Sequence, residues 1–132
     1  MNGLVSIFED RPEGRVCHVQ IGADGAVLAF NGHVDLGTGI EVALAQIVAE
    51  ELDVPLDDVQ MVLGDTAVTP NQGPTIASET IQVAALPLRR AAAQLRHWLA
   101  GQGARRLNAP AEGVTLRDGC VHWKDTQVSF AA

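Results

Sequence analysis

The chain has 132 residues and a formal net charge of −7, and 47% of its residues are hydrophobic. That length suits one domain with a core of its own, and the acidic balance argues against nucleic acid as a partner. No apolar run is long enough to span a membrane, and residues 1–15 lack the basic start and apolar centre of a signal peptide. We therefore expect a cytoplasmic protein that does not associate with membranes.

Residues 1–14 carry little periodic pattern and are expected to form a loose arm, with a strand that joins from elsewhere as the alternative. Alternation of apolar and polar residues then predicts a strand over 16–21 and a return strand over 27–34, connected by an Asp-Gly turn. The chain is expected to be one domain, 1–132, whose core spans residues 15–124.

The stretch 32–52 is interpreted as the end of a strand, a glycine-flanked turn and an amphipathic helix. Apolar residues recur at helical spacing on one face of this helix, at Ile40, Ala43, Leu44, Ile47, Val48 and Leu52. Thr38 and Glu41 have the spacing of a capping box, which predicts Thr38 as the residue that caps the helix. Gly37 and Gly39 leave the backbone amides of the first turn uncovered, and such a helix N-terminus is a potential anion site.

A proline at position 55 ends this helix, and residues 59–63 predict a short buried strand. The twelve residues at 64–75 are rich in turn formers and are long for a plain connection, which favours a functional loop. A second helical region is expected over 76–100, and Pro87 should kink it or divide it after Ala85.

The tail predicts a second Asp-Gly hairpin, with strands at 114–117 and 120–124. The element order is therefore β-β-α-β-α-β-β. This order indicates an α+β fold in which two helices pack on one mixed sheet.

Charged residues are distributed unevenly along the chain. Seven acidic residues and no Lys or Arg lie between residues 41 and 65, whereas five of the nine basic residues and no acid lie between 89 and 106. We interpret both runs as solvated helix faces. Complementary docking, within the chain or between two copies, is the alternative.

No catalytic or metal-binding residue is predicted from spacing alone. Asp35 and Asp65 each follow a strand beside a turn, where Asp commonly accepts backbone amides instead of moving protons. Two sets of metal-ligand residue types lack the spacing of a metal site: His33 with Asp35, and Cys17 and His18 with Cys120 and His122.

Two segments together carry a family resemblance: Gly-His-Val-Asp-Leu-Gly-Thr-Gly-Ile, which begins at residue 32, and Gly-Pro-Thr-Ile-Ala-Ser-Glu-Thr-Ile-Gln, which begins at residue 73. They resemble the molybdopterin-binding large subunit of the molybdenum hydroxylases, in the xanthine dehydrogenase and aldehyde oxidase superfamily. The chain is most similar to the isoquinoline 1-oxidoreductase and nicotinate dehydrogenase type. The similarity covers roughly residues 15–123, which is far more specific than one glycine motif.

This resemblance implies the fold of a subdomain of the molybdenum-cofactor-binding domain. It also implies molybdopterin as the cofactor, with a cytosine dinucleotide as one form of it. The residues it places at the cofactor are Gly37, Thr38, Gly39 and Ile40 in the first segment, and Thr75, Ala77, Ser78 and Glu79 in the second. Many relatives carry Gln where Thr38 stands, and Gly where Ala77 stands.

The chain resembles only part of the family's large subunit, and this leaves two hypotheses for its function. The family's large subunits are several times longer, and their catalytic glutamate and substrate-pocket segments have no counterpart in these 132 residues. The first hypothesis is a cofactor-binding piece of a hydroxylase. It would act with the remainder of a large subunit and an iron–sulfur subunit on N-heterocycles or aldehydes, with water as the oxygen source.

The second hypothesis is a stand-alone, non-catalytic module that retains the fold and at most a weak pterin or nucleotide site. The initiating methionine favours this second hypothesis. Under both hypotheses we expect no turnover by the isolated chain. We also expect self-association as a homodimer, because a segment that packs inside longer relatives should expose apolar surface.

Overall fold

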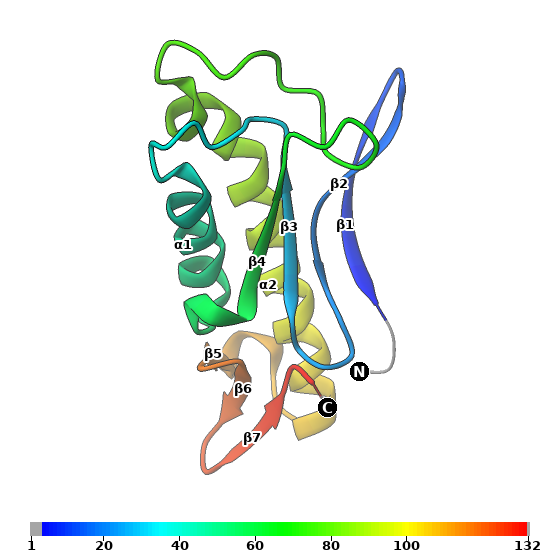
Figure 1. Ribbon diagram of the computed structural model, residues 1–132. Coiled ribbons are helices and arrows are strands. Elements are labelled where there is room, and N and C mark those ends of the chain that lie inside the picture. Colours follow the sequence, from blue (N-terminus) through cyan, green and yellow to red (C-terminus); the bar gives the residue numbers. More distant parts are fainter. Residues whose placement is uncertain (1–3, 132) are drawn as a thin grey trace.

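The computed structural model describes residues 4–131, which form two sheets and two long helices (Figure 1). The larger sheet has the order β1 (Val5–Arg11), β2 (Gly14–Ile21), β3 (Val27–Asn31) and β4 (Val59–Leu63). The smaller sheet consists of β5 (Thr115–Arg117), β6 (Cys120–Trp123) and β7 (Thr126–Ser129). The helices are α1 (Ile40–Leu52) and α2 (Ala85–Leu107), and a π-helical turn, η2 (Thr80–Ala84), directly precedes α2. Short 3-10 turns, η1 (Leu56–Asp58) and η3 (Ala111–Gly113), precede β4 and β5.

The parallel pair β3 and β4 determines where the two recognisable segments meet. The register runs from Val27 opposite Val59 to Asn31 opposite Leu63, so both strands finish at the same edge of the sheet. The chain crosses from one strand to the other through α1, as a parallel connection requires. The loops that follow β3 and β4 therefore lie together at one end of the molecule, and the smaller sheet lies at the other end (Figure 1).

Both helices pack against the same face of the larger sheet (Figure 1). The predicted apolar face of the first helix is confirmed at Leu44, Val48 and Leu52, which are fully buried. They share one core with the fully buried side chains Val19, Ala29, Leu88, Leu95 and Leu99. Each large aliphatic side chain buried in this way contributes roughly 1.5–3 kcal/mol of hydrophobic free energy.

Residues 5–11 form β1, so the loose arm predicted over residues 1–14 is wrong for them and the alternative of a strand is confirmed. This strand pairs with β2 in antiparallel register, from Val5 opposite Ile21 to Arg11 opposite Gly14, with an irregularity at Ile7. The pattern was hidden because the less exposed positions of the second half of the strand are polar. The first three residues of the predicted arm lie outside the described range.

The α+β fold with two helices is confirmed, but the single sheet is replaced by two. The helix α2 ends at Leu107 instead of residue 100, so the chain reaches the predicted hairpin beyond the edge of the larger sheet. There β6 pairs with β5 on one side and with β7, an unpredicted strand, on the other. The N–H of Gly119 donates to the carbonyl of Asp53 at 2.9 Å, which connects this sheet to the end of α1.

Pro87 lies in the first turn of α2, directly after the π-helical turn η2. The expected division of the second helical region falls between Ala84 and Ala85, where the π-helical turn becomes an α-helix. The residues at 76–78, expected to be helical, lie outside the helix, and residues 77 and 78 form a turn that precedes it. Within residues 4–131, no helix combines the length and the apolar character needed to cross a membrane.

Two glycines in α2 give a matched test of how the helix packs on the smaller sheet. A Cβ at position 103 would lie 2.5 Å from the Cβ and both Cγ atoms of Val121, whereas a Cβ at position 101 would meet nothing within 4 Å. We expect Gly103→Ala to lower the free energy of unfolding by about 1–3 kcal/mol through overpacking. Gly101→Ala should raise it by about 0.5–1 kcal/mol through helix propensity. Urea denaturation measures both, and equal effects of the two substitutions would contradict the packing.

Candidate functional site

The two loops at the carboxyl ends of β3 and β4 are held together by direct contacts. The backbone N–H of Gly32 donates to Gln72 Oε1 at 2.7 Å. Position 32 has no room for a side chain, because a Cβ there would collide with the carbonyl oxygen of Pro70. The segments 37–40 and 75–79, which lie far apart in the sequence, therefore belong to loops that meet in space.

A set of polar side chains, Asn31, His33, Gln72 and Thr80, lies beneath these loops and is called the polar cluster below. Asn31, His33 and Thr80 are buried. The side-chain amides of Asn31 and Gln72 both donate to the carbonyl of Ala84, at 3.0 and 2.8 Å. Asn31 Oδ1 in turn accepts the N–H of His33 at 3.1 Å. The polar cluster thus fixes the last residue of η2 relative to β3 and to the loop after β4.

His33 holds a single tautomer that its two partners define. Its Nε2 lies 3.2 Å from the carbonyl oxygen of Gln72, which only accepts, so Nε2 carries the proton. Its Nδ1 lies 2.7 Å from Thr80 Oγ1 and accepts the hydroxyl proton. Both nitrogens are used by structural contacts, and the imidazole connects the loop after β4 to η2.

Asp35 binds three backbone amides that lead into α1 and one amide of its first turn, an arrangement called the Asp35 cap below. Its Oδ1 accepts the N–H groups of Gly37 at 2.8 Å, Thr38 at 3.0 Å and Gly39 at 3.3 Å, and its Oδ2 accepts the N–H of Glu41 at 3.1 Å. These amides, first that of Glu41 and then that of Gly37, hold the pKa of Asp35 below its ordinary value. The interpretation of Asp35 as an acceptor of backbone amides is confirmed.

The predicted capping box of Thr38 and Glu41 is wrong. The residue at the N-cap position is Gly39, with φ of 82°, and it makes no side-chain cap bond. The hydroxyl of Thr38 makes no hydrogen bond within residues 4–131. The expected open anion site is also wrong at these positions, because the carboxylate of Asp35 already accepts the N–H groups of Gly37, Thr38, Gly39 and Glu41.

The second segment adopts an unusual backbone conformation just before η2. Ala77 and Ser78 have φ of 55° and 56°, in the left-handed region that glycine enters with the least strain. Glu79 then returns to the right-handed region, and its N–H donates to the carbonyl of Ile76 at 3.1 Å. Successive left- and right-handed residues can direct neighbouring N–H groups toward one side, but in this turn the N–H of Glu79 is already used by Ile76.

The two segments enclose a pocket of about 340 Å³. Its lining consists of Leu36, Thr38, Ile40, Thr75, Ile76, Ala77, Ser78, Thr80 and Ile81. Of the eight residues predicted at the cofactor, the structure therefore places Thr38, Ile40, Thr75, Ala77 and Ser78 on this lining. Gly37, Gly39 and Glu79 are their neighbours in the chain and are not part of the lining.

The chemistry of this pocket favours a neutral, hydrogen-bonding group over a phosphate. The lining includes neither Lys nor Arg, and several of its residues are aliphatic. Its hydroxyl groups are those of Thr38, Thr75, Ser78 and Thr80. Thr75 accepts the N–H of Val34 at 2.9 Å and Thr80 bonds His33, which leaves Thr38 and Ser78 available for a ligand.

Sequence reasoning missed the polar cluster and the cap. The polar residues at the end of β3, Asn31 and His33, were the available signal, because a buried strand end with two polar residues requires partners. Of the two metal-ligand combinations, the cysteine pair is divided between two sheets, with Cys17 in β2 and Cys120 in β6. In the other, both ring nitrogens of His33 contact Thr80 and Gln72, and Asp35 accepts backbone amides. In the range 4–131, no group of three or more His, Cys, Asp or Glu residues is placed to hold a metal ion.

Comparison with known proteins identifies what this arrangement is similar to. A family profile described as a molybdopterin cofactor-binding domain matches residues 1–132. One subunit of the nicotinate dehydrogenase of Pseudomonas putida is 59% identical over 103 residues, which are 78% of this chain and 9% of that protein. A probable hypoxanthine oxidase, XdhD of Escherichia coli K12, is 31% identical over 115 residues, which are 86% of this chain and 12% of that protein.

Among solved structures, quinoline 2-oxidoreductase from Pseudomonas putida 86 matches with a TM-score of 0.75 and 31% identity. The match covers 86% of this chain and 15% of that one. The chain thus spans only about a tenth of the length of the curated relatives it matches.

Asp35 gives a pH-dependent test of the cap. Because its folded-state pKa is depressed, its stabilising effect is present above the unfolded pKa of about 4 and is lost as pH falls through the folded value. We expect Asp35→Asn to lower the melting temperature at pH 7, and the difference from the unsubstituted chain to shrink below about pH 4.

Thr38→Ala is the matched control for this experiment and should leave the melting temperature unchanged, because the hydroxyl bonds nothing in the described part of the chain. If Thr38→Ala lowers the melting temperature as much as Asp35→Asn does, Thr38 caps the helix after all, and the assignment of Asp35 as the cap is contradicted.

Proposed function

We propose that this chain, which belongs to the molybdopterin cofactor-binding domain family, forms one wall of the cofactor site in an oxidoreductase of the xanthine dehydrogenase type. The observation that carries the proposal is the meeting of two distant segments around one pocket. These are the segments through which the chain resembles the molybdenum hydroxylases. When bound, molybdopterin would hold the redox-active metal of the enzyme, and this chain would contribute binding and orientation.

The residues present fit a pterin. A pterin is flat and neutral and carries several hydrogen-bond donors and acceptors, so it needs an apolar slot with a few polar groups. Ile40 and Ile76 provide apolar walls, and the hydroxyls of Thr38 and Ser78 provide the available polar groups. The left-handed turn at Ala77 and Ser78 brings the backbone close to the pocket without a long side chain between them.

The nucleotide form of the cofactor is a finer proposal. A dinucleotide carries a diphosphate, yet the pocket lining has no basic residue, and Asp35 already accepts the amides from Gly37 to Gly39 and that of Glu41. We propose that this wall contacts the pterin, and that cations from another part of the enzyme hold the diphosphate of a cytosine dinucleotide. Under this proposal Gly37 and Gly39 leave room for the cofactor and do not bind phosphate.

The remaining parts of the enzyme are proposals as well. The rest of a large subunit and an iron–sulfur subunit would supply the other walls and the electron path, and the substrate would be an N-heterocycle or an aldehyde. A cytoplasmic location stays a prediction of the sequence. A stand-alone, non-catalytic module is the second candidate, because the polar cluster and the cap are satisfied without any ligand. An adjacent reading frame that encodes the missing cofactor segments would favour the enzyme.

Binding of a simple pterin tests the proposed wall directly. We expect 6-hydroxymethylpterin to shift the NMR amide resonances of residues 36–41 and 75–81. Substituting Thr38→Val together with Ser78→Ala should weaken that binding by about tenfold, because two hydrogen bonds are lost.

Thr115→Val, on β5 at the other end of the molecule, is the control and should leave the affinity unchanged. Shifts confined to other residues, or equal affinity of the double variant and the control, would contradict the placement of the pterin.

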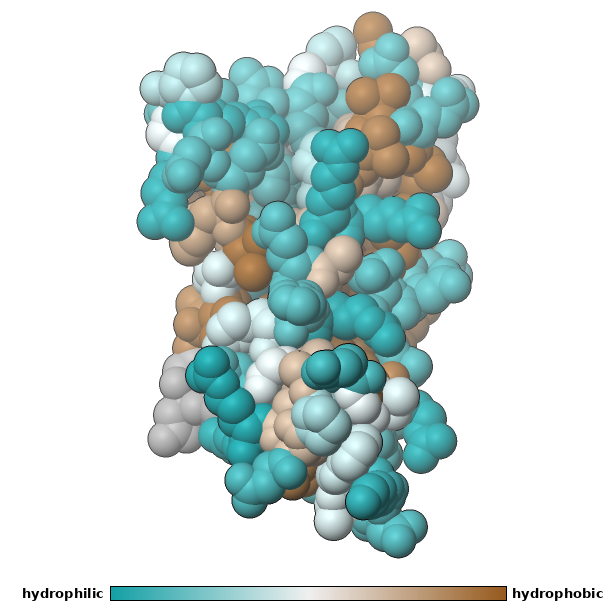
Figure 2. Space-filling model, turned by 180° about the vertical axis from the view of Figure 1, so that it is seen from behind, coloured by the Kyte–Doolittle hydropathy of each residue, from teal (hydrophilic) through white to brown (hydrophobic). Residues whose placement is uncertain are grey.

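Several large hydrophobic side chains are exposed to solvent on the surface around the pocket. Leu36 is 71% exposed and Ile76 is 59% exposed, and Ile81, Val83 and Leu86 are also exposed. Figure 2 shows hydrophobic residues gathered over this end of the molecule. We propose that the remainder of a large subunit covers this apolar surface, and that the isolated chain covers it with a second copy of itself.

Sedimentation at micromolar concentration in physiological salt tests self-association. We expect a dimer, because salt screens most of the repulsion from a net charge of −7. Val83→Asp should weaken the dimer at least about tenfold, because it places a charge in the buried surface. Leu56→Asp, in η1 at the other end of α1, is the matched control and should not. A single monomeric species for the unsubstituted chain would contradict the homodimer.

A further inference from the structure

The amino-terminal hairpin of β1 and β2 carries three linked polar residues, Glu9, Arg11 and His18. His18 is only 3% exposed, and its Nε2 lies 2.6 Å from Glu9 Oε2. Arg11 Nη2 donates to the same carboxylate oxygen at 3.1 Å. A carboxylate only accepts, so Nε2 of His18 carries the proton. One oxygen of Glu9 therefore fixes both the imidazole and the guanidinium.

The other side of the guanidinium reaches the loop that follows β4. Arg11 Nη1 donates to the carbonyl of Asn71 at 2.8 Å, and the Arg11 side chain is only 17% exposed. Asn71 directly precedes Gln72, whose side chain and carbonyl contact Gly32, Ala84 and His33. Arg11 thus binds the loop at Asn71, one residue before Gln72 of the polar cluster.

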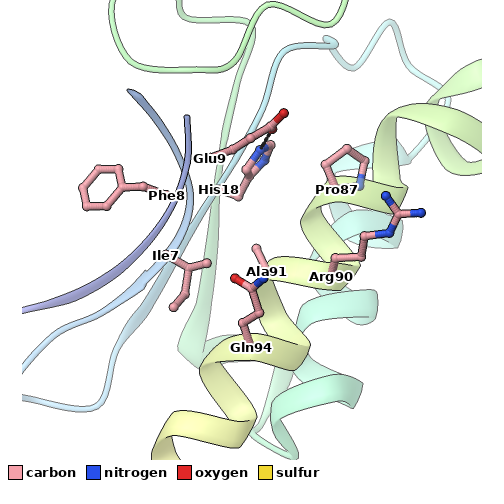
Figure 3. Close-up of a pocket in the computed structure, with 8 residues that line it drawn as sticks. All are labelled: Ile7, Phe8, Glu9, His18, Pro87, Arg90, Ala91 and Gln94. Carbon is pink, nitrogen blue, oxygen red and sulfur yellow. Dashed lines mark hydrogen bonds and ion pairs between the residues drawn. The ribbon is translucent and has the colours of Figure 1, made fainter. Parts of the chain in front are cut away.

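Within residues 4–131, no hydrogen bond or ion pair joins Glu9, Arg11 or His18 to α2, although α2 packs against the same hairpin. Figure 3 shows Glu9 and His18 on one wall of a pocket of about 280 Å³, with Arg90 and Gln94 of α2 on the opposite wall. Nδ1 of His18 is buried and has no hydrogen-bond partner in the described part of the chain. The guanidinium of Arg11 is held by Glu9 on one side and by Asn71 on the other, and its hydrogen bond to Asn71 connects the hairpin to the loop.

We propose that Arg11 is a positioning residue for the pocket formed by the two loops, oriented by Glu9 and His18. This inference rests on the proposed function of that pocket. The charge on the carboxylate holds the guanidinium, and the guanidinium holds the carbonyl of Asn71. The loop is then positioned so that Gln72 contacts Gly32, His33 and Ala84, and Thr75 lines the pocket. A guanidinium group is required, because Arg11 donates to Asn71 through Nη1 and to Glu9 through Nη2, and a lysine has a single nitrogen.

Residue-resolved hydrogen exchange of the ligand-free chain tests the proposal. The N–H groups of Gly32 and Val34 are bonded to side chains of the loop, and the N–H of Gly119 is bonded to Asp53 far from it. We expect Arg11→Ala to raise exchange at Gly32 and Val34 by about tenfold and to leave Gly119 unchanged, because a charge-assisted hydrogen bond to the loop is lost.

Arg11→Lys retains one donor and should give an intermediate increase, which keeps the proposal testable if Arg11→Ala unfolds. Glu9→Gln should raise exchange at the same two amides. The matched control is Arg15→Ala on the same hairpin, because Arg15 contacts Asp10 and Phe8 and not the loop.

Exchange at Gly32 and Val34 that changes less than about twofold in Arg11→Ala, or that rises equally at Gly119, would overturn the proposal. The measurement requires no cofactor. Failure of the chain to bind a pterin would therefore count against the proposed function alone.

Discussion

The carbonyl of Ala84, at the end of the π-helical turn, is the point on which the site depends. It accepts amide protons from Asn31 on β3 and from Gln72 in the loop after β4. A buried polar group left without a partner costs about 1–3 kcal/mol, so these contacts allow one arrangement of strand end, loop and helix and penalise the others. The hydrophobic core places α2 against the sheet, and the polar cluster fixes η2, whose residues Thr80 and Ile81 line the pocket.

The cap at α1 shows how the same requirement shapes the chemistry of the pocket. Backbone amides at a helix N-terminus attract anions, and the glycines at 37 and 39 place no side chain beside those amides. Asp35 supplies the anion from within the chain. This stabilises the loop in the absence of a ligand and leaves the pocket to neutral groups. A diphosphate would have to compete with a carboxylate that is already held by four amides.

The sequence predicts those features of the fold that depend on local pattern. The apolar face of α1, the Asp-Gly turns and the alternating strands arise from residues close together in the chain, and they were found. The strand β1 escaped because Glu9 and Arg11 occupy less exposed positions for a reason visible only in three dimensions, namely their contacts with His18 and Asn71. The separation into two sheets escaped because it depends on where α2 ends, which periodicity does not define well. The family segments indicated the position of the pocket, but not the residues that hold its walls together.

The contacts that build the site are also those that sequence pattern detects least. The bonds from Asn31 to Ala84, from His33 to Thr80 and from Arg11 to Asn71 join residues separated by 53, 47 and 60 positions. Closing such long loops costs conformational entropy that these bonds alone do not recover, so they form only when the core has already brought β3, β4 and α2 together. The pocket is therefore a property of the assembled domain. A peptide that carried either family segment alone would have the right residues without the hydrogen bonds that position them.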